Sequence, residues 1–280
     1  MGAGTRLRKV MAEKGLVEAM AGHSPLSAML AAEAGFDAIW ASGFELSALY
    51  GVPDVSIVSM TQHLDMTRAM ADRSGLPVVA DIDTGFGNAI NVLYAVEQYE
   101  RAGVGAIVME DKSFPKVTSL IAGGRQDMVR IEEFQGKIEA ARSARRDPDL
   151  LVVARTEALK RARAYEAAGA DLILVHSKQK TPDEIEAFIK AWDGKVPIAL
   201  VPTAYPQMTV ARVRELKKVG LLIWGNHAIR AAVGAMRATF AQIRRDGGIH
   251  GVEASIPSVD AVFDLQGMGT VKDNEKRFLR

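Results

Sequence analysis

The feature that most constrains the fold of this 280-residue chain is a phrase that recurs along it: the end of a helix, a glycine and a short apolar run. It occurs as "AEAGFDAI", "ERAGVGAI" and "EAAGADLI". A glycine at such a place is typical of a helix C-terminus, where it adopts a left-handed conformation. The apolar run that follows is typical of a buried strand. The chain is therefore expected to alternate helices with the strands of a parallel sheet.

Eight apolar runs have the length and composition of buried strands, and helical segments such as "NVLYAVEQYERAG" separate them. Eight strand–helix units predict a (β/α)₈ TIM barrel as a single domain over residues 1–280, with 228–280 as a C-terminal helical region. A doubly wound open sheet is the main alternative. The expected strands are Val17–Ala21, Asp37–Ala41, Val78–Ile82, Ala106–Glu110, Leu151–Arg155, Leu172–His176, Ile198–Val201 and Leu221–Trp224.

Composition argues against several classes of function. The 35 basic residues are scattered among 34 acidic ones, so no nucleic-acid partner is expected. Two basic clusters, 142–146 and 160–163, are interpreted as solvated helix faces. The absence of cysteine excludes disulfides, thiolate nucleophiles and cysteine-based metal sites. The N-terminus lacks the apolar core of a signal peptide and no apolar run is long enough for a membrane span, so a cytoplasmic protein without a membrane partner is expected.

Two carboxylates end the third expected strand, in the stretch "VADIDTGFGN". Residues i and i+2 of a strand share a face, so Asp81 and Asp83 are expected to project side by side. Because an unpaired buried carboxylate is costly, a cation is expected between them. The alternative is a turn in which Asp83 hydrogen-bonds its own backbone before Gly85. Together with Glu110 on the next strand, these oxygen ligands predict Mg²⁺ or Mn²⁺ rather than zinc.

Other useful side chains are expected at the same edge, because active sites of this fold lie at the C-terminal ends of the strands. Arg155 fits an anion clamp. Its alternative is an ion pair with Glu157 or with a metal-binding carboxylate. His176 is interpreted as a proton donor or as a buried barrel histidine, and the sequence leaves both open. The loop after Trp40 supplies a hydroxyl and backbone N–H groups that can hold a carboxylate or an oxyanion, at Ser42, Gly43 and Phe44.

Some neighbouring residues are given structural interpretations. Asp111 is expected to face away from Glu110. Asn226 is interpreted as a helix cap and is left outside the site with His227. Asp54, after Pro53, is interpreted as a turn residue.

The polar segment from Glu110 to Met128 predicts a mobile lid whose functional residues are Lys116, Thr118 and Ser119. The alternative is a merely solvated loop.

Five stretches in order, "GFDAIWASGF", "VVADIDTGFGN", "VMEDKSFPKVTSL", "VVARTEAL" and "AGADLILVHSK", together resemble the phosphoenolpyruvate mutase/isocitrate lyase superfamily. The resemblance runs from about Leu16 to the helix after Asn226. Carbon–carbon lyases of the superfamily typically carry a lid cysteine, which this chain lacks. The chain therefore resembles the phosphonate branch, whose members break or rearrange a P–C bond. Mutases of that branch typically read "K-x-N-S" in the lid, whereas the hydrolases carry Thr, as Thr118 does here.

The resemblance implies Mg²⁺-dependent hydrolysis of the P–C bond of phosphonopyruvate to pyruvate and phosphate, with Mn²⁺ or Co²⁺ as substitutes for Mg²⁺. Isomerisation between phosphonopyruvate and phosphoenolpyruvate is the alternative. A carbon–carbon lyase or decarboxylase acting on oxaloacetate-like acids is a weaker one, and a barrel that only binds a metal or an anion is the non-catalytic alternative.

The resemblance also implies a role for each matching residue. Asp81 would bind Mg²⁺ directly, and Asp83 and Glu110 would hold its waters. The pyruvyl end would be bound by Trp40, Ser42, Gly43 and Phe44. The phosphoryl group would be surrounded by Lys116, Thr118, Ser119, Leu120, Arg155 and His176. Asp54 returns to the site, because it lies in the family's active-site region.

Two further expectations come from the resemblance. About a dozen residues found in relatives after the position of Leu159 are absent, as a shortened loop or an omitted segment. Homodimers or homotetramers are expected, in which a C-terminal helix is swapped onto a neighbouring barrel. The apolar face of that helix would consist of Val259, Val262, Phe263 and Leu265.

Overall fold

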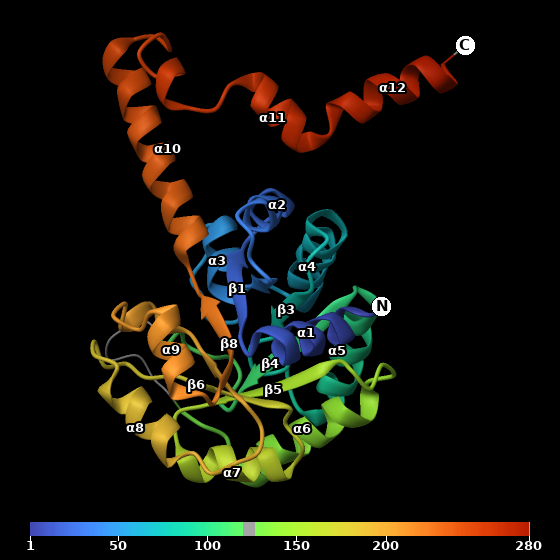
Figure 1. The fold of residues 1–280 in the computed structure, drawn as a ribbon, viewed down its shortest axis with the longest axis vertical. Coiled ribbons are helices and arrows are strands. Elements are labelled where there is room, and N and C mark those ends of the chain that lie inside the picture. The colour runs from blue at the N-terminus through green and yellow to red at the C-terminus, as the bar shows by residue number, and fades with distance from the viewer. Residues whose placement is uncertain (120–126, 280) are drawn as a thin grey trace. The chain divides into compact units, whose positions relative to one another are not determined.

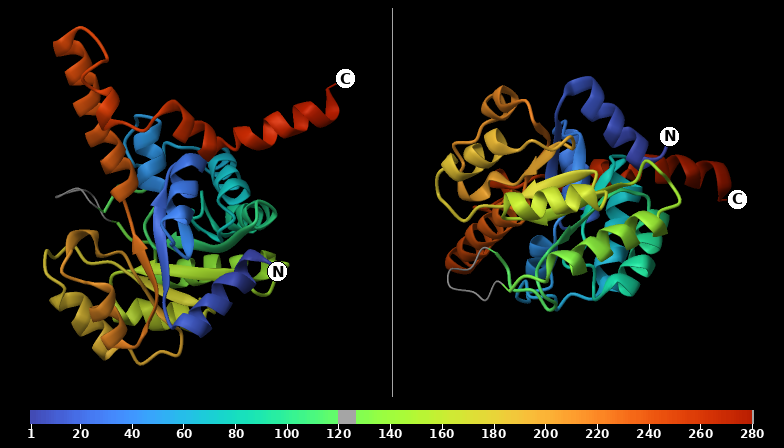
Figure 2. Two further views of the ribbon diagram at one scale, coloured as in Figure 1. Left: turned by 45° about the horizontal axis from the view of Figure 1, so that its top comes forward. Right: turned by 90° about the horizontal axis from the view of Figure 1, so that it is seen from below.

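The computed structural model describes residues 1–119 and 127–279, and within them eight parallel strands form one closed barrel. Each strand pairs with the next, and β8 pairs with β1. The predicted TIM barrel is confirmed, and each strand overlaps the expected run (Figures 1 and 2). The strands are β1 Val17–Gly22, β2 Ala38–Ala41, β3 Val78–Asp81, β4 Val104–Glu110, β5 Leu151–Thr156, β6 Leu172–Val175, β7 Ile198–Leu200 and β8 Val219–Trp224.

Helices alternate with the strands and lie outside the barrel (Figure 2). Several of them begin at a capping side chain; at the start of α2, for example, the Ser24 hydroxyl accepts the backbone N–H of Ser27. The helices of the barrel are α1 Ala3–Lys14, α2 Pro25–Glu33, α3 Gly43–Leu49, α4 Met60–Ser74, α5 Ala89–Arg101, α6 Ile131–Ala144, α7 Leu159–Ala167, α8 Asp183–Ala191 and α9 Val210–Leu216, with a 3₁₀ turn at Pro202–Ala204.

Buried apolar side chains form two layers, one inside the barrel and one between the strands and the helices. Alternate residues of a strand face opposite sides, so every second residue belongs to the inner layer. The inner layer contains Val79 of β3, Val108 of β4, Val153 of β5 and Leu174 of β6. Two residues beyond each of these stands a predicted site residue: Asp81, Glu110, Arg155 and His176. The period of two that builds the core therefore also places these residues at the mouth.

The connection after β5 is short, because only Glu157 and Ala158 separate that strand from α7. One prediction for this region was wrong. Arg161, in a basic cluster expected to be solvated, turns inward, and its Nη1 lies 2.9 Å from Asp111 Oδ2. Its Nη2 donates to the carbonyl of Val129. Through Arg161, helix α7 thus contacts the segment that follows β4 at Asp111 and at Val129.

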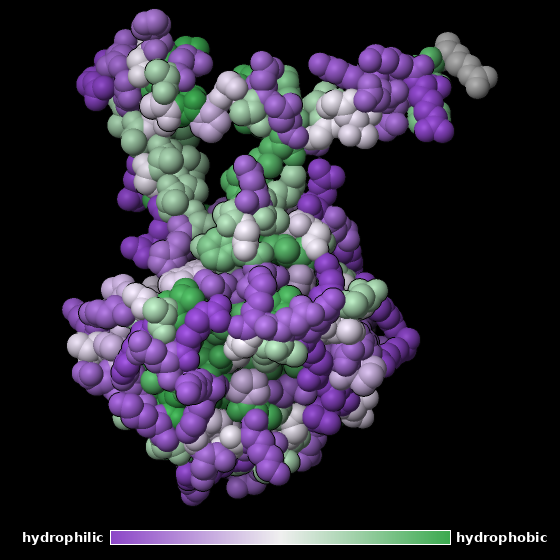
Figure 3. All heavy atoms as spheres, in the orientation of Figure 1, coloured by the Kyte–Doolittle hydropathy of each residue, from purple (hydrophilic) through white to green (hydrophobic). Residues whose placement is uncertain are grey.

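The chain divides into two compact units, Met1–Ile229 and Arg230–Arg280. The second unit contains most of α10 His227–Asp246, a 3₁₀ turn at Glu253–Ser255, α11 Val259–Gln266 and α12 Met268–Phe278. No described residue of α11 or α12 is buried, and Figure 3 shows hydrophobic residues at the surface of this unit. Across the described residues, no helix combines the length and apolar character that crossing a membrane requires.

Candidate active site

A cavity at the C-terminal ends of the barrel strands brings most of the predicted site residues together. Trp40, Ser42, Phe44, Asp54, Asp81, Lys116, Thr118, Ser119, Arg155 and His176 line it. Val201, Thr203, Ala204, Gly225 and Asn226, which sequence reasoning did not place in the site, complete the wall. Leu120 lies outside the described residues.

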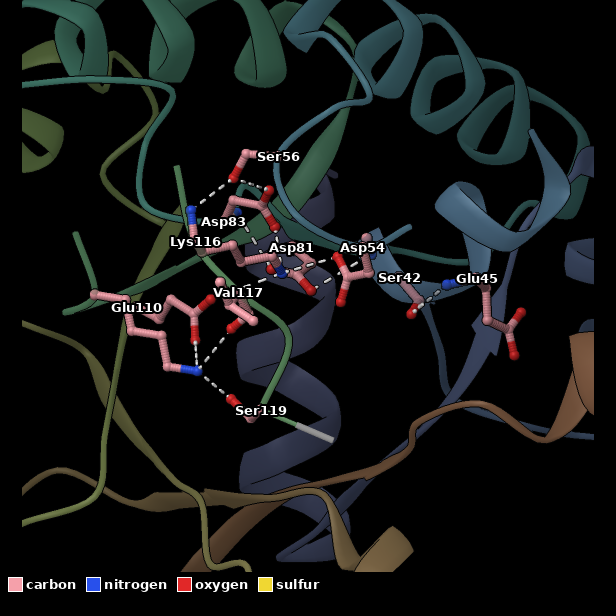
Figure 4. A network of polar contacts seen from close by, with 12 residues as sticks. Ser42, Glu45, Asp54, Ser56, Asp81, Asp83, Glu110, Lys116, Val117 and Ser119 are labelled. Atoms are coloured by element: carbon pink, nitrogen blue, oxygen red, sulfur yellow. Dashed lines mark hydrogen bonds and ion pairs between the residues drawn. The ribbon is translucent and has the colours of Figure 1, made fainter. Parts of the chain in front are cut away.

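Three carboxylates gather around the ammonium group of Lys116 (Figure 4). Its Nζ lies 2.6 Å from Asp83 Oδ1, 3.2 Å from Asp54 Oδ1 and 3.7 Å from Glu110 Oε1. Lys116 is only 4% exposed, so these pairs are shielded from water. The ammonium of Lys116 is thus a cation in direct contact with Asp83.

Asp83 reaches the site by a route that differs from the prediction. The strand ends at Asp81, and Asp83 lies in a turn with a left-handed φ of 52°. Its N–H donates to Asp81 Oδ1 at 3.2 Å. The argument from strand alternation was therefore wrong for Asp83, and the turn interpretation describes its backbone. Left-handed backbone is uncommon outside glycine, and here a hydrogen bond from Ser56 Oγ to Asp83 Oδ2, at 3.2 Å, helps to hold it.

Asp81, Asp83 and Glu110 differ in how readily they ionise. Burial raises the pKa of Asp81 and raises that of Asp83 to about 6. Burial also opposes ionisation of Glu110, but the positive charges of Arg155, Lys116 and Lys112 outweigh it and lower the pKa of Glu110 to about 2. An additional cation would therefore stabilise the ionised forms of the two aspartates more than the ionised form of Glu110.

These residues fit a magnesium ion by their donor chemistry. The converging donors are carboxylate oxygens, and Mg²⁺ is usually held by one or two carboxylates while it keeps several waters. Among residues 1–119 and 127–279, no group of three or more His, Asp or Glu side chains is arranged so that it could hold a metal ion. Gly43 also leaves room here, since a Cβ at this position would lie 3.1 Å from Asp83 Oδ1 and 3.3 Å from Asp81 Oδ2.

Arg155 enters the cavity from the end of β5. Its Nε lies 3.5 Å from Glu110 Oε2, and its Nη2 donates to Ser119 Oγ at 2.9 Å. The pairing with a predicted metal carboxylate, given above as an alternative, is therefore present. Of these two partners of Arg155, Glu110 ends β4 and Ser119 lies in the segment after it. His176 Nδ1 lies 3.8 Å from Glu157 Oε1, too far for a hydrogen bond, and burial lowers the His176 pKa.

The loop after β2 is fixed by a buried acid that the sequence did not single out. Ser42 Oγ accepts the backbone N–H of Glu45 at 3.2 Å, and the Gly43 N–H lies 3.4 Å from Asp81 Oδ2. The Glu45 carboxylate contacts His23 Nδ1 at 2.8 Å and accepts the Ile229 N–H at 3.2 Å. Glu45 of α3 thus joins the loop after β1, at His23, to the first turn of α10, at Ile229.

Several other residues near the site bear on the predictions. Asp111 faces away from the cavity, as expected, and its Oδ2 accepts hydrogen bonds from Thr156, Arg161 and Tyr165. Asn226 precedes α10, as a cap would, but it also lines the cavity, so leaving it outside the site was wrong. Lys112 was missed altogether, although it stands two residues from Glu110 and therefore on the same side of the extended chain.

The fold and this cavity define a (β/α)₈ barrel with a carboxylate-lined mouth. The chain belongs to the phosphoenolpyruvate phosphomutase family, whose model matches residues 7–244. Phosphonopyruvate hydrolase of Variovorax sp. (strain Pal2) is 60% identical over 98% of each chain. Phosphoenolpyruvate phosphomutase of Tetrahymena pyriformis is 41% identical, over 98% of this chain and 95% of that one.

A solved structure is similar over its whole length. The crystal structure of a phosphonopyruvate hydrolase in complex with oxalate and Mg²⁺ matches with a TM-score of 0.95 and 56% identity, covering 100% of both chains. The predicted membership of this superfamily is confirmed.

Proposed function

We propose that this protein is a Mg²⁺-dependent hydrolase that splits phosphonopyruvate into pyruvate and phosphate. The observation that carries the proposal is that one cavity is bordered by Asp81 and Asp54 and also by Arg155, Thr118 and Ser119. A carboxylate wall suits a metal-bound 2-oxo acid, and a cationic and hydroxyl wall suits a phosphoryl group. The similarity to an enzyme named phosphonopyruvate hydrolase supports the same activity.

Cleavage of the P–C bond leaves electrons on carbon, which the adjacent keto group can accept as an enolate. A bound Mg²⁺ supplies Lewis-acid charge that stabilises this enolate. Asp81 is proposed as the direct ligand, and Asp83 and Glu110 as acceptors for metal-bound waters. Ser42 and the backbone at Gly43 and Phe44, with Trp40 beside them, would orient the pyruvyl end.

The phosphoryl group leaves through a loose transition state that needs positioning and charge neutralisation more than covalent help. Arg155 supplies a fork of donors at the cavity wall. Lys116, when it gives up the carboxylates to a metal ion, can turn its charge toward the phosphoryl oxygens. His176, whose pKa burial lowers, can accept or donate a proton beside them.

Thr118 is proposed to orient the attacking water. A threonine hydroxyl both donates and accepts a hydrogen bond, and its side chain is shorter than the asparagine that the mutases typically carry in its place. Pyruvate release measured by a coupled reductase, with and without chelator, tests this function. Mg²⁺-dependent release is expected, and a lack of pyruvate at saturating Mg²⁺ would refute the proposal.

The assembly and location are also proposed. Exposed apolar side chains on α11 are the expected contact of a homodimer or homotetramer in which C-terminal helices exchange between subunits: Val259 is 68% exposed and Phe263 43%. A cytoplasmic location stays a prediction, which cell fractionation can test.

A further inference from the structure

Lys112 is a buried charge for which the proposed mechanism has no role. It is 6% exposed and lies just past the end of β4. The backbone at Lys112 is held in place, because Lys112 pairs with Met128 in an isolated antiparallel bridge. Next to that bridge, the Ser113 N–H donates to the Asp127 carbonyl at 2.8 Å, and the Val129 N–H donates to the Asp111 carbonyl at 2.9 Å. The side chain therefore extends from a well-braced stretch of backbone.

The ammonium of Lys112 contacts three groups, all labelled in Figure 4. It donates to Ser119 Oγ, and to the carbonyl of Val117 at 3.4 Å. Glu110 Oε2 lies 3.6 Å away. Two of the three partners flank Thr118 in the chain, one on each side. A single buried donor thus ties down both neighbours of that residue.

We propose that Lys112 is a positioning residue for hydrolysis: it holds Val117 and Ser119 and thereby sets where Thr118 stands on the cavity wall. This inference rests on the proposed function, in which Thr118 orients the attacking water. Ser119 Oγ also accepts a hydrogen bond from Arg155 Nη2 at 2.9 Å. By holding Ser119, Lys112 therefore also fixes the position of the proposed phosphoryl-binding arginine relative to Thr118.

A simpler role would be to neutralise the buried charge of Glu110. The contacts argue for more than this, because Arg155 and Lys116 already lie within 4 Å of that carboxylate. Lys112 is also farther from Glu110 than from Ser119. The two roles differ in their coupling: neutralisation acts through Glu110, whereas positioning acts through Thr118.

A double-mutant cycle separates these roles. Lys112→Met, Thr118→Ala and the double variant are compared with the native chain for kcat and KM on phosphonopyruvate, with phosphate measured directly. We expect Lys112→Met to lower kcat about 10- to 100-fold with a much smaller change in KM, as for a coupled pair worth up to a few kcal/mol. The double variant should be scarcely slower than Thr118→Ala alone, because Lys112 acts through Thr118.

Two further variants complete the experiment. Lys112→Gln removes the charge but keeps an N–H donor, so it should retain more kcat than Lys112→Met, and it replaces that variant in the cycle if Lys112→Met does not fold. Lys218→Met is the control: Lys218 also donates to backbone carbonyls, those of Ile189 and Lys190, but it precedes β8 at the other end of the barrel. It should leave kcat unchanged.

Two results would overturn the proposal: native kcat in Lys112→Met, or losses that multiply fully in the double variant. Absence of phosphate from the native chain would instead refute the proposed function itself, and the inference with it.

Discussion

At the scale of single residues, Lys116 places its charge among carboxylates that are proposed to bind Mg²⁺ or its waters. Its Nζ lies 2.6 Å from Asp83 Oδ1, and neighbouring carboxylates raise the Lys116 pKa well above its ordinary value despite burial. Removing this charge takes the ammonium group away from Asp54 and Asp83. We therefore predict that Lys116→Met binds Mg²⁺ about 10-fold more tightly, a change of ~1.4 kcal/mol, while its turnover falls.

Titration calorimetry with Mg²⁺ alone measures this effect without any substrate. Lys9→Met, which removes an exposed charge from α1, is the matched control and should bind Mg²⁺ as the native chain does. Equal or weaker Mg²⁺ affinity in Lys116→Met would show that the lysine and the metal do not compete.

Arg155 offers a second test at this scale. Its guanidinium reaches Glu110 and Ser119 at once, which the single ammonium of a lysine cannot reproduce with the same geometry. Arg155→Lys is expected to lower kcat/KM about 100-fold, equivalent to losing one or two charge-assisted hydrogen bonds. Steady-state kinetics measures this, and near-native values would mean that charge alone suffices at this position.

At the scale of elements, a buried histidine joins α4 to α5 beneath the loop that carries Asp83. His63 Nδ1 lies 2.7 Å from the Tyr99 hydroxyl, and burial lowers the His63 pKa from 6.5 to about 4. The unfolded chain therefore binds more protons than the folded one between pH 6.5 and 4, so stability falls as the pH drops through this window. The loss by pH 4 amounts to roughly 3 kcal/mol.

Urea unfolding at pH 7 and at pH 5 measures this contribution. His63→Asn keeps a polar atom near the Nδ1 position but cannot be protonated, so its stability should fall less between the two pH values. His250→Asn, at an exposed histidine, is the control and should show the native pH dependence. An unchanged pH dependence in His63→Asn would mean that other groups account for it.

The elements also show what the sequence could and could not predict. All eight strands were found from apolar runs, but β4 and β8 begin two residues before the predicted starts, because Gly105 and Gly220 interrupt the runs. The turn at Asp83 could not be read from periodicity, since its left-handed φ depends on Asp81 and on Ser56 from a distant loop.

The site residues, too, include some that the sequence could predict and some that it could not. Residues that continue an inward-facing row of a strand, such as Glu110 and Arg155, were predictable from the period of two. Glu45 and Lys112 were not, because charged residues near the end of an element usually face solvent, and only tertiary contacts bury these two. The one signal available for Lys112 was its spacing from Glu110.

At the scale of the whole molecule, α11 presents an apolar face that is expected to lie in a subunit interface. Val262 is 41% exposed and Phe263 43%. Replacing both with Asp should dissociate the proposed oligomer, because charges are strongly disfavoured in the core of an interface. Light scattering after gel filtration measures the mass. Gln266→Asp, on the same helix, should keep the native mass, and a native chain that is already monomeric would contradict the proposed assembly.

In the proposed reaction, the phosphoryl group passes to water. The most direct measurement is a phosphorus NMR time course of the native protein with phosphonopyruvate and Mg²⁺, in which phosphonopyruvate, phosphate and phosphoenolpyruvate give separate signals. We predict that the phosphate signal grows as phosphonopyruvate disappears, with at most traces of phosphoenolpyruvate, and that Thr118→Ala slows this growth strongly. Accumulation of phosphoenolpyruvate without phosphate would refute transfer to water, because the protein would then be a mutase.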